Sequence, residues 1–227
     1  MPFPELPNRL LEVRRRIDAA VRRGGHGQTV RIVAVTKTHG PGAVQAAYGA
    51  GLVDVGENRV QEALSKMDAV SVPARWHLIG HLQRNKVKSL LRFDLFHALD
   101  SSRLADAVDA LGREAGRTVD ALVQVNVIGE ETKGGFEQSG WRQEAERLRT
   151  LPGIRVRGVM TMAPLGADEC TLRAVFAGAR AARDVLVAAG HEATELSMGM
   201  SNDYEIAVEE GATFVRLGTI LFGARPA

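Results

Sequence analysis

The stretch Arg31-Ile32-Val33-Ala34-Val35-Thr36-Lys37 decides the fold, because it has the composition of a short buried strand and ends in a lysine. The chain breaks soon after it, at Gly40-Pro41-Gly42. Strand alternation places Val33, Val35 and Lys37 on one face. Partial desolvation at the end of such a strand favours a neutral amine, so Lys37 is a candidate Schiff-base nucleophile. On this stretch alone, the preferred interpretation is that the lysine simply marks where the strand meets water, so the Schiff-base role depends on the rest of the chain.

Outward from this strand, short apolar segments alternate with amphipathic ones along the whole chain. Strands are predicted at residues 31–36, 52–56, 75–79, 94–98, 119–127, 154–161, 193–197 and 213–218. Helices are predicted at residues 6–23, 42–50, 59–69, 84–91, 102–115, 138–150, 169–189 and 202–210. This alternation predicts an α/β fold, a single (β/α)8 barrel of the TIM type with an extra N-terminal helix, in one domain over residues 1–227. An open doubly wound sheet is the second choice, but no Gly-x-Gly-x-x-Gly turn follows the first strand.

The composition narrows the class of partner. Hydrophobic residues make up 45% of the 227 residues, and 29 basic residues against 27 acidic ones give a formal charge of +2, which does not indicate a nucleic-acid surface. A single cysteine, Cys170, excludes an intramolecular disulfide and favours a reducing compartment. No apolar run approaches the ~20 residues of a membrane span. We therefore expect a cytoplasmic protein that binds neither nucleic acid nor membrane.

Polar and small residues follow several predicted strands, where the chemistry of a barrel gathers. Asn58 follows the second strand and is placed to hydrogen-bond a ligand. The loops after the last two strands often build a phosphate site, which makes Ser201, Gly218 and Thr219 candidate phosphate ligands. The alternative for these residues is structural: Ser201 caps a helix, and Gly218 and Thr219 form a turn.

Arg216 is a charged residue in the middle of an apolar run. Alternation places it on one face with Phe214 and Gly218, and a buried guanidinium needs a partner. A carboxylate such as Glu57 or Glu195 is one candidate, and a ligand at the site is the other. A Schiff-base lysine, phosphate ligands and an inward arginine together suit pyridoxal 5'-phosphate (PLP), whose aldehyde, phosphate and pyridine nitrogen they would meet.

Several motifs, in order along the chain, resemble those of the pyridoxal phosphate homeostasis protein family. They are Ala34-Val35-Thr36-Lys37, Gly56-Glu57-Asn58, Trp76-His77-Leu78-Ile79-Gly80-x-Leu82-Gln83-x-Asn85-Lys86, Leu196-Ser197-Met198-Gly199-Met200-Ser201 and Val215-Arg216-Leu217-Gly218-Thr219-x-Leu221-Phe222-Gly223. The resemblance extends from Arg31 to Arg225. It implies a barrel similar to the N-terminal domain of alanine racemase, with PLP on Lys37. The segment Thr38-His39-Gly40-Pro41 and Asn202 depart from the pattern without touching these motifs.

The resemblance also implies the other contacts to the cofactor. Asn58 would lie beside PLP, Met200 would contribute to its wall, Ser201, Gly218 and Thr219 would hold its phosphate, and Arg216 would face its pyridine nitrogen. A cation there disfavours protonation of that nitrogen by like-charge repulsion. The ring would then be a weak electron sink, unlike the ring of enzymes that stabilise carbanions.

Three functions are compared. The first is a PLP carrier or buffer in intracellular PLP homeostasis, a monomer or weak dimer with apo PLP-dependent enzymes as partners and no turnover of its own. The second is a PLP-dependent amino-acid racemase or decarboxylase, but Tyr48 and Tyr204 both lie in predicted helices, so no tyrosine base is evident. The third is a cofactor-free aldolase, which would leave Arg216 without a purpose. The first function is preferred.

Other side chains near the strand ends are assigned structural roles. His77 is expected to orient a neighbour rather than act as a base. The methionines are expected to form core or cofactor wall rather than a metal site, since no other ligands accompany them; they are Met160, Met162, Met198 and Met200. Glu130 and Lys133 are expected to form an exposed pair, with the alternative that Lys133 is a second, mobile amine for cofactor transfer.

Overall fold

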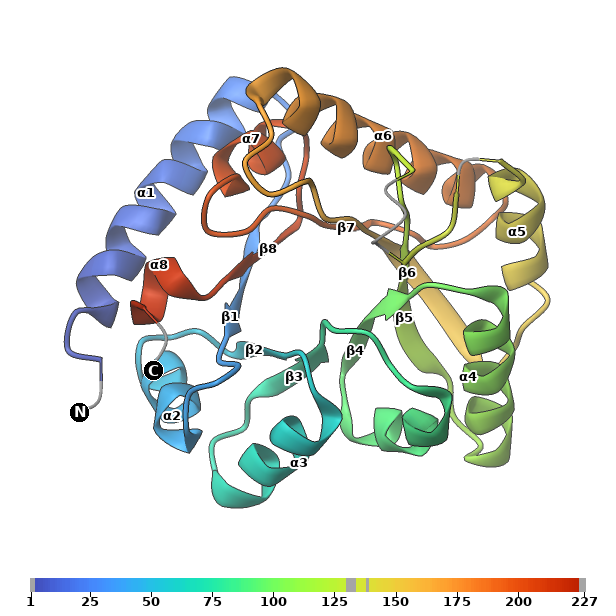
Figure 1. Cartoon of the computed structure of the whole chain (residues 1–227), viewed down its shortest axis with the longest axis horizontal. Coiled ribbons are helices and arrows are strands. Elements are labelled where there is room, and N and C mark those ends of the chain that lie inside the picture. The colour runs from blue at the N-terminus through green and yellow to red at the C-terminus, as the bar shows by residue number, and fades with distance from the viewer. Residues whose placement is uncertain (1–2, 130–133, 138, 225–227) are drawn as a thin grey trace.

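Eight parallel strands close into a barrel in chain order in the computed structural model, which describes residues 3–129, 134–137 and 139–224 (Figure 1). The strands are β1 (Arg31–Val35), β2 (Asp54–Glu57), β3 (Arg75–Leu78), β4 (Leu95–Leu99), β5 (Val119–Gln124), β6 (Ile154–Met160), β7 (Glu195–Ser197) and β8 (Phe214–Leu217). Closure comes from β1 and β8, which pair in parallel with Val33 opposite Arg216. The predicted (β/α)8 barrel is therefore confirmed, and the strand that leads to Lys37 lies beside the strand that carries Arg216.

Helices surround the barrel and connect its strands (Figure 1). They are α1 (Leu6–Gly24), α2 (Pro41–Gly49), α3 (Val60–Ala69), η1 (Arg84–Arg92), α4 (Ser102–Glu114), α5 (Trp141–Leu148), α6 (Glu169–Ala188), α7 (Tyr204–Glu209) and α8 (Thr219–Phe222). Among the described residues, none of these helices has the length and apolar character needed to cross a bilayer.

Three helical segments differ from the sequence prediction. The segment predicted at 84–91 is the 3₁₀ helix η1, whose buried residues Val87 and Leu90 are three apart, the period of that helix. The helix predicted from residue 202 begins only at Tyr204, because the carboxylate of Asp203 accepts the Met200 N–H at 2.5 Å and holds a turn before it. The short helix α8 was not predicted.

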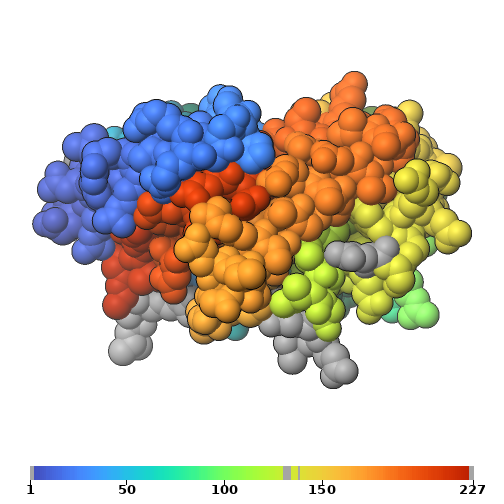
Figure 2. Space-filling view, turned by 90° about the horizontal axis from the view of Figure 1, so that it is seen from above, coloured from blue at the N-terminus to red at the C-terminus, as the bar shows by residue number. Residues whose placement is uncertain are grey.

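The extra N-terminal helix α1 covers the place where the barrel closes. Its buried residues Leu6, Leu10, Val13, Ile17 and Ala20 recur at helical spacing and form one apolar stripe. Figure 2 shows the blue helix packed directly on the red C-terminal segment, which contains α7 and α8. The first and last parts of the chain thus stabilise each other around β1 and β8.

Two glycines are required where strands approach closely. A Cβ on Gly158, whose φ is +153°, would lie 1.9 Å from the carbonyl oxygen of Glu195 on β7. A Cβ on Gly56 would lie 2.7 Å from a methyl of Val33 inside the barrel. Any larger residue at either position would push neighbouring strands apart and displace β1 or β7.

Candidate functional site

A cavity of about 630 Å³ opens at the C-terminal ends of the strands. This volume lies in the range typical of small-molecule pockets, about 300–1,000 Å³. All the residues singled out as ligands from the sequence line it: Lys37, Asn58, Met200, Ser201, Arg216, Gly218 and Thr219. Residues separated by up to 182 positions in the chain, from Lys37 to Thr219, are thus brought to one place by the closure of the barrel.

Lys37 is half-buried and lies two residues beyond the end of β1. The residue before it is held by two hydrogen bonds from outside the barrel. The Thr36 hydroxyl donates to Glu57 Oε1 at 2.5 Å, and Lys66 Nζ donates to the Thr36 carbonyl oxygen at 2.7 Å. Lys66 also donates to Glu57 Oε1 at 2.6 Å, so one buried ion pair fixes the end of the strand.

The residue after the lysine is held as well. Thr38 has a positive φ of 67°, an uncommon conformation for a residue with a Cβ. Its N–H donates to Glu62 Oε1 at 2.6 Å, and the same carboxylate oxygen accepts from Lys66 Nζ at 2.8 Å. The backbone on both sides of Lys37 is therefore tied to one cluster, the loop anchor, formed by Glu57, Glu62 and Lys66.

The ion pair in the loop anchor is almost completely removed from water. The side chain of Glu57 is 0% exposed and that of Lys66 is 5% exposed. Burial raises the pKa of the Glu57 carboxyl, although the hydrogen bonds from Lys66 and Thr36 oppose this effect. Because a buried ion that loses its partner is costly, the two side chains depend on each other.

Arg216 points into the barrel from β8 and is 5% exposed. Its Nη1 donates to the carbonyl oxygen and the hydroxyl of Ser197, at 2.7 and 2.8 Å, and its Nη2 donates to the carbonyl oxygen of Thr161 at 2.9 Å. Burial lowers the pKa of the guanidinium to about 10, so it remains a cation at neutral pH. Of the two predicted outcomes for Arg216, the structure supports a place at the ligand cavity.

The carboxylate partners proposed for Arg216 are wrong. Glu57 lies outside the barrel, where it binds Lys66, and Glu195 binds Arg31 at 2.6 Å at the other end of the barrel. The carboxylate whose charge acts on Arg216 is that of Asp203, which lines the same cavity and opposes the lowering of the Arg216 pKa by burial. Strand alternation gives the direction of a side chain but not its height in the barrel, and height decides which partner it meets.

The loops after β7 and β8 meet at the cavity. The hydroxyl of Ser201 accepts the N–H of Ile220 at 3.3 Å and so joins the two loops. Ser201 does not cap α7, contrary to the structural alternative; the residue at that position is Asp203, which also lines the cavity. A Cβ on Gly218 would lie 3.3 Å from the carbonyl oxygen of Val35, so glycine leaves space between the two strands there.

Part of the wall was missed from the sequence. The loop of residues 162–167 after β6 closes one side, and Val35, Ile79, Leu172 and Asn202 contribute elsewhere. The Pro164-Leu165-Gly166 break directly after a predicted strand is the signal that could have identified this loop. The methionines divide between the two roles proposed for them: Met162 and Met200 line the cavity, and Met160 and Met198 are buried in the core.

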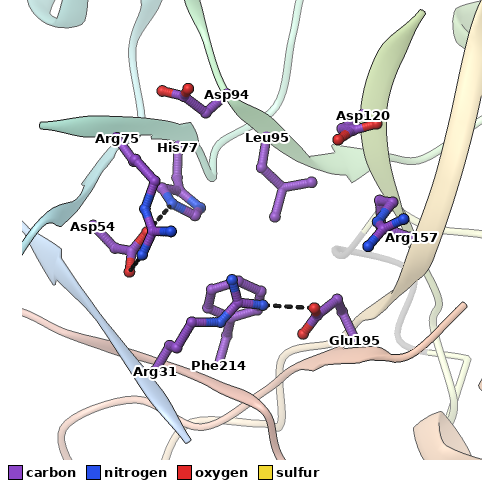
Figure 3. A pocket seen from close by; sticks show the side chains of 10 residues that line it. All are labelled: Arg31, Asp54, Arg75, His77, Asp94, Leu95, Asp120, Arg157, Glu195 and Phe214. Carbon is purple, nitrogen blue, oxygen red and sulfur yellow. Dashed lines mark hydrogen bonds and ion pairs between the residues drawn. The ribbon is translucent and has the colours of Figure 1, made fainter.

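A second cavity, of about 150 Å³, lies at the opposite, N-terminal end of the barrel (Figure 3). It is lined by Arg31, Asp54, Arg75, His77, Asp94, Leu95, Asp120, Arg157, Glu195 and Phe214. Four of the charged groups here pair with each other: Arg75 with Asp54 at 2.7 Å, and Arg31 with Glu195 at 2.6 Å. His77 is hydrogen-bonded to Asp54 at 2.9 Å, so it lies on the floor of the barrel rather than at the mouth.

The remaining candidates have simple outcomes. Tyr48 and Tyr204 lie in α2 and α7, as predicted, and among the described residues that line the mouth cavity none is a tyrosine. Lys133 and Glu130 lie outside the described residues. In the part of the chain that the structure describes, no group of three or more His, Cys, Asp or Glu side chains is placed to hold a metal.

The fold and the mouth cavity define a barrel of the alanine racemase class with a lysine after its first strand. Residues 10–226 match the family model described as "Alanine racemase, N-terminal domain". A relative from Aquifex aeolicus named pyridoxal phosphate homeostasis protein is 42% identical over 225 residues, 96% of this chain and 97% of that protein. One from Pseudomonas aeruginosa with the same name is 38% identical over 92% of this chain and 90% of that protein. The chain belongs to the pyridoxal phosphate homeostasis protein family.

Solved structures agree with this assignment. PipY of Synechococcus elongatus PCC7942, solved with PLP bound, is 37% identical and superposes with a TM-score of 0.85 over 96% of this chain and all of that one. Alanine racemase from Corynebacterium glutamicum is 17% identical and superposes with a TM-score of 0.72 over 92% of this chain and 61% of that one. The second likeness concerns the fold alone.

Proposed function

We propose that this protein binds PLP in the mouth cavity, holds it as a reversible Schiff base on Lys37, and serves intracellular PLP homeostasis as a carrier or buffer without turnover of its own. The observation that carries the proposal is the convergence of an amine, hydroxyls and a buried guanidinium on one cavity of about 630 Å³. The names of the curated relatives and the PLP-bound PipY structure support the same ligand. We assign this role to a single domain over residues 1–227.

The chemistry of the lining residues fits PLP. Lys37 supplies an amine for the aldehyde, Ser201 and Thr219 supply hydroxyls for the phosphate, and apolar side chains such as Ile79 supply walls for the ring. Gly218 keeps the phosphate end open, because a Cβ there would crowd the backbone of Val35. Asn58 and Met200 complete the proposed contacts.

The proposed attachment of PLP to Lys37 needs no oxidant, reductant or other co-reactant. The neutral amine of Lys37 adds to the aldehyde carbon and a water molecule leaves; addition of water reverses the step. When bound, PLP supplies an electron-withdrawing ring. Arg216 stays a cation near neutral pH and opposes protonation of the pyridine nitrogen, so the site favours holding the cofactor over stabilising a carbanion.

Borohydride trapping tests the attachment. Protein incubated with PLP should turn yellow, and reduction followed by peptide mapping should place the label on Lys37. Lys37→Ala should abolish the label, whereas Lys88→Ala, at an exposed lysine of η1, should leave it unchanged. A protein that stays colourless and unlabelled, or a label that persists in Lys37→Ala, would show that the proposal is wrong.

The second candidate function is a racemase or decarboxylase of the same fold group. The absence of a tyrosine among the described lining residues argues against a racemase of the usual type. The PLP-loaded protein should therefore show no sustained turnover with a panel of amino acids. Multiple turnovers on any of them would replace the carrier function with an enzymatic one.

The carrier function also requires recipients. We propose apo PLP-dependent enzymes as partners of a monomer or weak dimer, with Lys133 as a second amine that assists transfer. Transfer would be measured as recovery of activity by a purified apo-enzyme mixed with the loaded protein. An unchanged rate in Lys133→Ala would remove that lysine from the transfer step.

A further inference from the structure

An unbroken chain of hydrogen bonds crosses the interior of the barrel from the mouth to the floor. Arg216 Nη1 lies 2.8 Å from Ser197 Oγ, and Ser197 Oγ lies 2.9 Å from His97 Nδ1. His97 Nε2 lies 2.8 Å from His77 Nδ1, and His77 Nε2 lies 2.9 Å from Asp54 Oδ1. Each member comes from a different strand, in the order β8, β7, β4, β3 and β2.

The middle of this hydrogen-bond chain is removed from water, and its two ends border the mouth and floor cavities. Ser197 and His97 are 0% exposed, and the other three members are at most 5% exposed. The ring of Phe214 packs edge-on against His77, with centroids 5.5 Å apart, and lies 5.7 Å from the ring of His97. Since Ser197 and His97 are fully buried, their side-chain polar atoms must find hydrogen-bond partners inside the barrel.

The direction of every bond follows from the donors available. Arg216 can only donate, so it occupies one lone pair of the Ser197 hydroxyl. Among the described residues, the other atom within hydrogen-bond reach of this hydroxyl is Nδ1 of His97, so the hydroxyl proton goes to Nδ1. Neutral His97 then carries its proton on Nε2 and donates it to Nδ1 of His77. Because Nδ1 of His77 accepts this hydrogen bond, it holds no proton, so the proton of His77 lies on Nε2 and is donated to the carboxylate of Asp54. Both histidines are thereby fixed in the Nε2–H tautomer.

The charges at the two ends agree with this direction. Burial, followed by the neighbouring His77, Arg216 and Arg31, lowers the pKa of His97 well below its usual value, so this ring is neutral. Burial opposes ionisation of Asp54, but the hydrogen bonds from His77 and Arg75 hold the pKa of its carboxyl below the usual value. A cation at the mouth is therefore connected to a carboxylate at the floor through Ser197, His97 and His77.

At the floor, the last residue of the hydrogen-bond chain is held by a residue that does not belong to it. Arg75 Nη2 donates to Oδ2 of Asp54 at 2.7 Å, which leaves Oδ1 to accept from His77, as Figure 3 shows. Arg31 stacks on the Phe214 ring at 3.8 Å and pairs with Glu195. The floor cavity thus holds the last acceptor of the chain in one orientation.

We propose that Ser197, His97, His77 and Asp54 are positioning residues for Arg216, and that Asp54, at the floor of the barrel, sets the hydrogen-bond direction that the guanidinium meets at the mouth. The effect on the cofactor rests on the proposed function. The hydrogen-bond direction does not, because it is a property of the cofactor-free protein and can be measured there.

The substitution Asp54→Asn should reverse the donor-to-acceptor direction of the hydrogen bonds that involve the two histidines. Arg75 would keep the amide oxygen as its acceptor, so the amide NH₂ would face Nε2 of His77 and donate to it. His77 would then carry its proton on Nδ1 and donate to Nε2 of His97, and His97 would donate from Nδ1 to the Ser197 hydroxyl. The hydroxyl would receive two donors, from His97 and Arg216, and its own proton would lose its acceptor.

Histidine side-chain ¹⁵N NMR on the cofactor-free protein tests this directly. In the wild type, both His77 and His97 should show a protonated Nε2 and an unprotonated Nδ1. In Asp54→Asn the two nitrogen types should exchange in both rings. Asp120→Asn is the matched control, because Asp120 lines the same floor cavity but pairs with Arg155. It should leave both tautomers unchanged.

The outcomes separate the proposal from the proposed function. A wild-type protein in which either ring carries its proton on Nδ1 overturns the proposal without any variant. Unchanged tautomers in folded Asp54→Asn overturn it too. With PLP bound, Asp54→Asn should shift the absorbance spectrum and Asp120→Asn should not; equal spectra would remove the effect on Arg216. A wild-type protein that binds no PLP would show that the proposed function is wrong, but it would not change the tautomer result.

Discussion

The mouth and the floor of the barrel use the same kinds of side chain in opposite ways. At the floor, cations and anions pair with each other around a cavity of about 150 Å³, as Arg31 does with Glu195 and Arg75 with Asp54. At the mouth, a lysine, two hydroxyls and an arginine line a cavity of about 630 Å³. The number of charged residues therefore does not identify the site. The floor is richer in charged residues, but its central groups pair with one another, whereas the mouth groups converge on a space large enough for a ligand.

The largest expected effect comes from breaking the buried Lys66–Glu57 ion pair of the loop anchor. Lys66→Met should destabilise the fold by about 3–5 kcal/mol, because it leaves Glu57 buried without its cation. Urea denaturation measures this effect. Lys88→Met is the control and should change stability by less than about 0.5 kcal/mol, since Lys88 is exposed. A loss below about 1 kcal/mol in Lys66→Met would mean that the loop anchor is not an ion pair in solution.

The next effect is the loss of folding stability at low pH that His97, in the hydrogen-bond chain between mouth and floor, should cause. The folded pKa of His97 lies below its unfolded value, so below about pH 6.5 the unfolded state binds a proton that the native state does not. Stability should therefore fall as pH falls, by up to about 1.4 kcal/mol per pH unit for this one group. Glu57, with a raised pKa, acts in the opposite sense, so the contribution of His97 is measured as a difference.

That difference is obtained from His97→Gln, which keeps a donor and an acceptor but cannot gain the proton. Denaturation at several pH values from 7 to 5 should give a shallower loss of stability in this variant than in the wild type. His191→Gln is a matched comparison, because burial also lowers the pKa of His191. Identical pH slopes for wild type and His97→Gln would show that His97 is not held neutral.

A smaller effect is expected at Ser201, a proposed phosphate ligand in the mouth. Ser201→Ala removes one hydroxyl from the lining and should weaken PLP binding by about 0.5–1.5 kcal/mol, up to about tenfold. Pyridoxal, which lacks the phosphate, should bind the variant and the wild type equally. Spectroscopic titration with both compounds measures this. Equal losses for PLP and pyridoxal would place Ser201 away from the phosphate.

The smallest effect is expected at the rim of the floor. Asp120 and Arg155 form a salt bridge in which the arginine side chain is 54% exposed. Asp120→Asn should cost less than about 1 kcal/mol of stability, and less in high salt, because water and ions screen an exposed pair. A loss as large as that of Lys66→Met would make the floor pairs as important to the fold as the buried loop anchor.

Most of the mouth could be predicted from the sequence because most ligand candidates lie within a few residues after the end of a strand. Lys37, Asn58, Ser201 and Thr219 are fixed by the position of a strand end, and a parallel barrel brings all such ends to one side. Small errors in strand limits do not change this arrangement. The prediction of the fold and of this part of the site therefore does not depend on the exact limits of individual strands.

The chain of hydrogen bonds through the interior of the barrel could not be predicted in this way. Alternation places His97 and Ser197 inside the barrel, but the stagger between strands decides which inward residues lie at one height. His97 and Ser197 are 100 positions apart, and no local pattern relates them. The same limit explains the wrong carboxylate partners for Arg216 and the missed helix α8, whose four residues are too few for a periodic signal.

The loop anchor has a kinetic consequence. The backbone before and after Lys37 is held by hydrogen bonds at Thr36 and Thr38, so the amine is carried on a fixed support. Loading and unloading should then need no movement of the main chain. Their rates should follow the concentrations of aldehyde and water and the fraction of neutral amine, and solvent viscosity should have little influence on them.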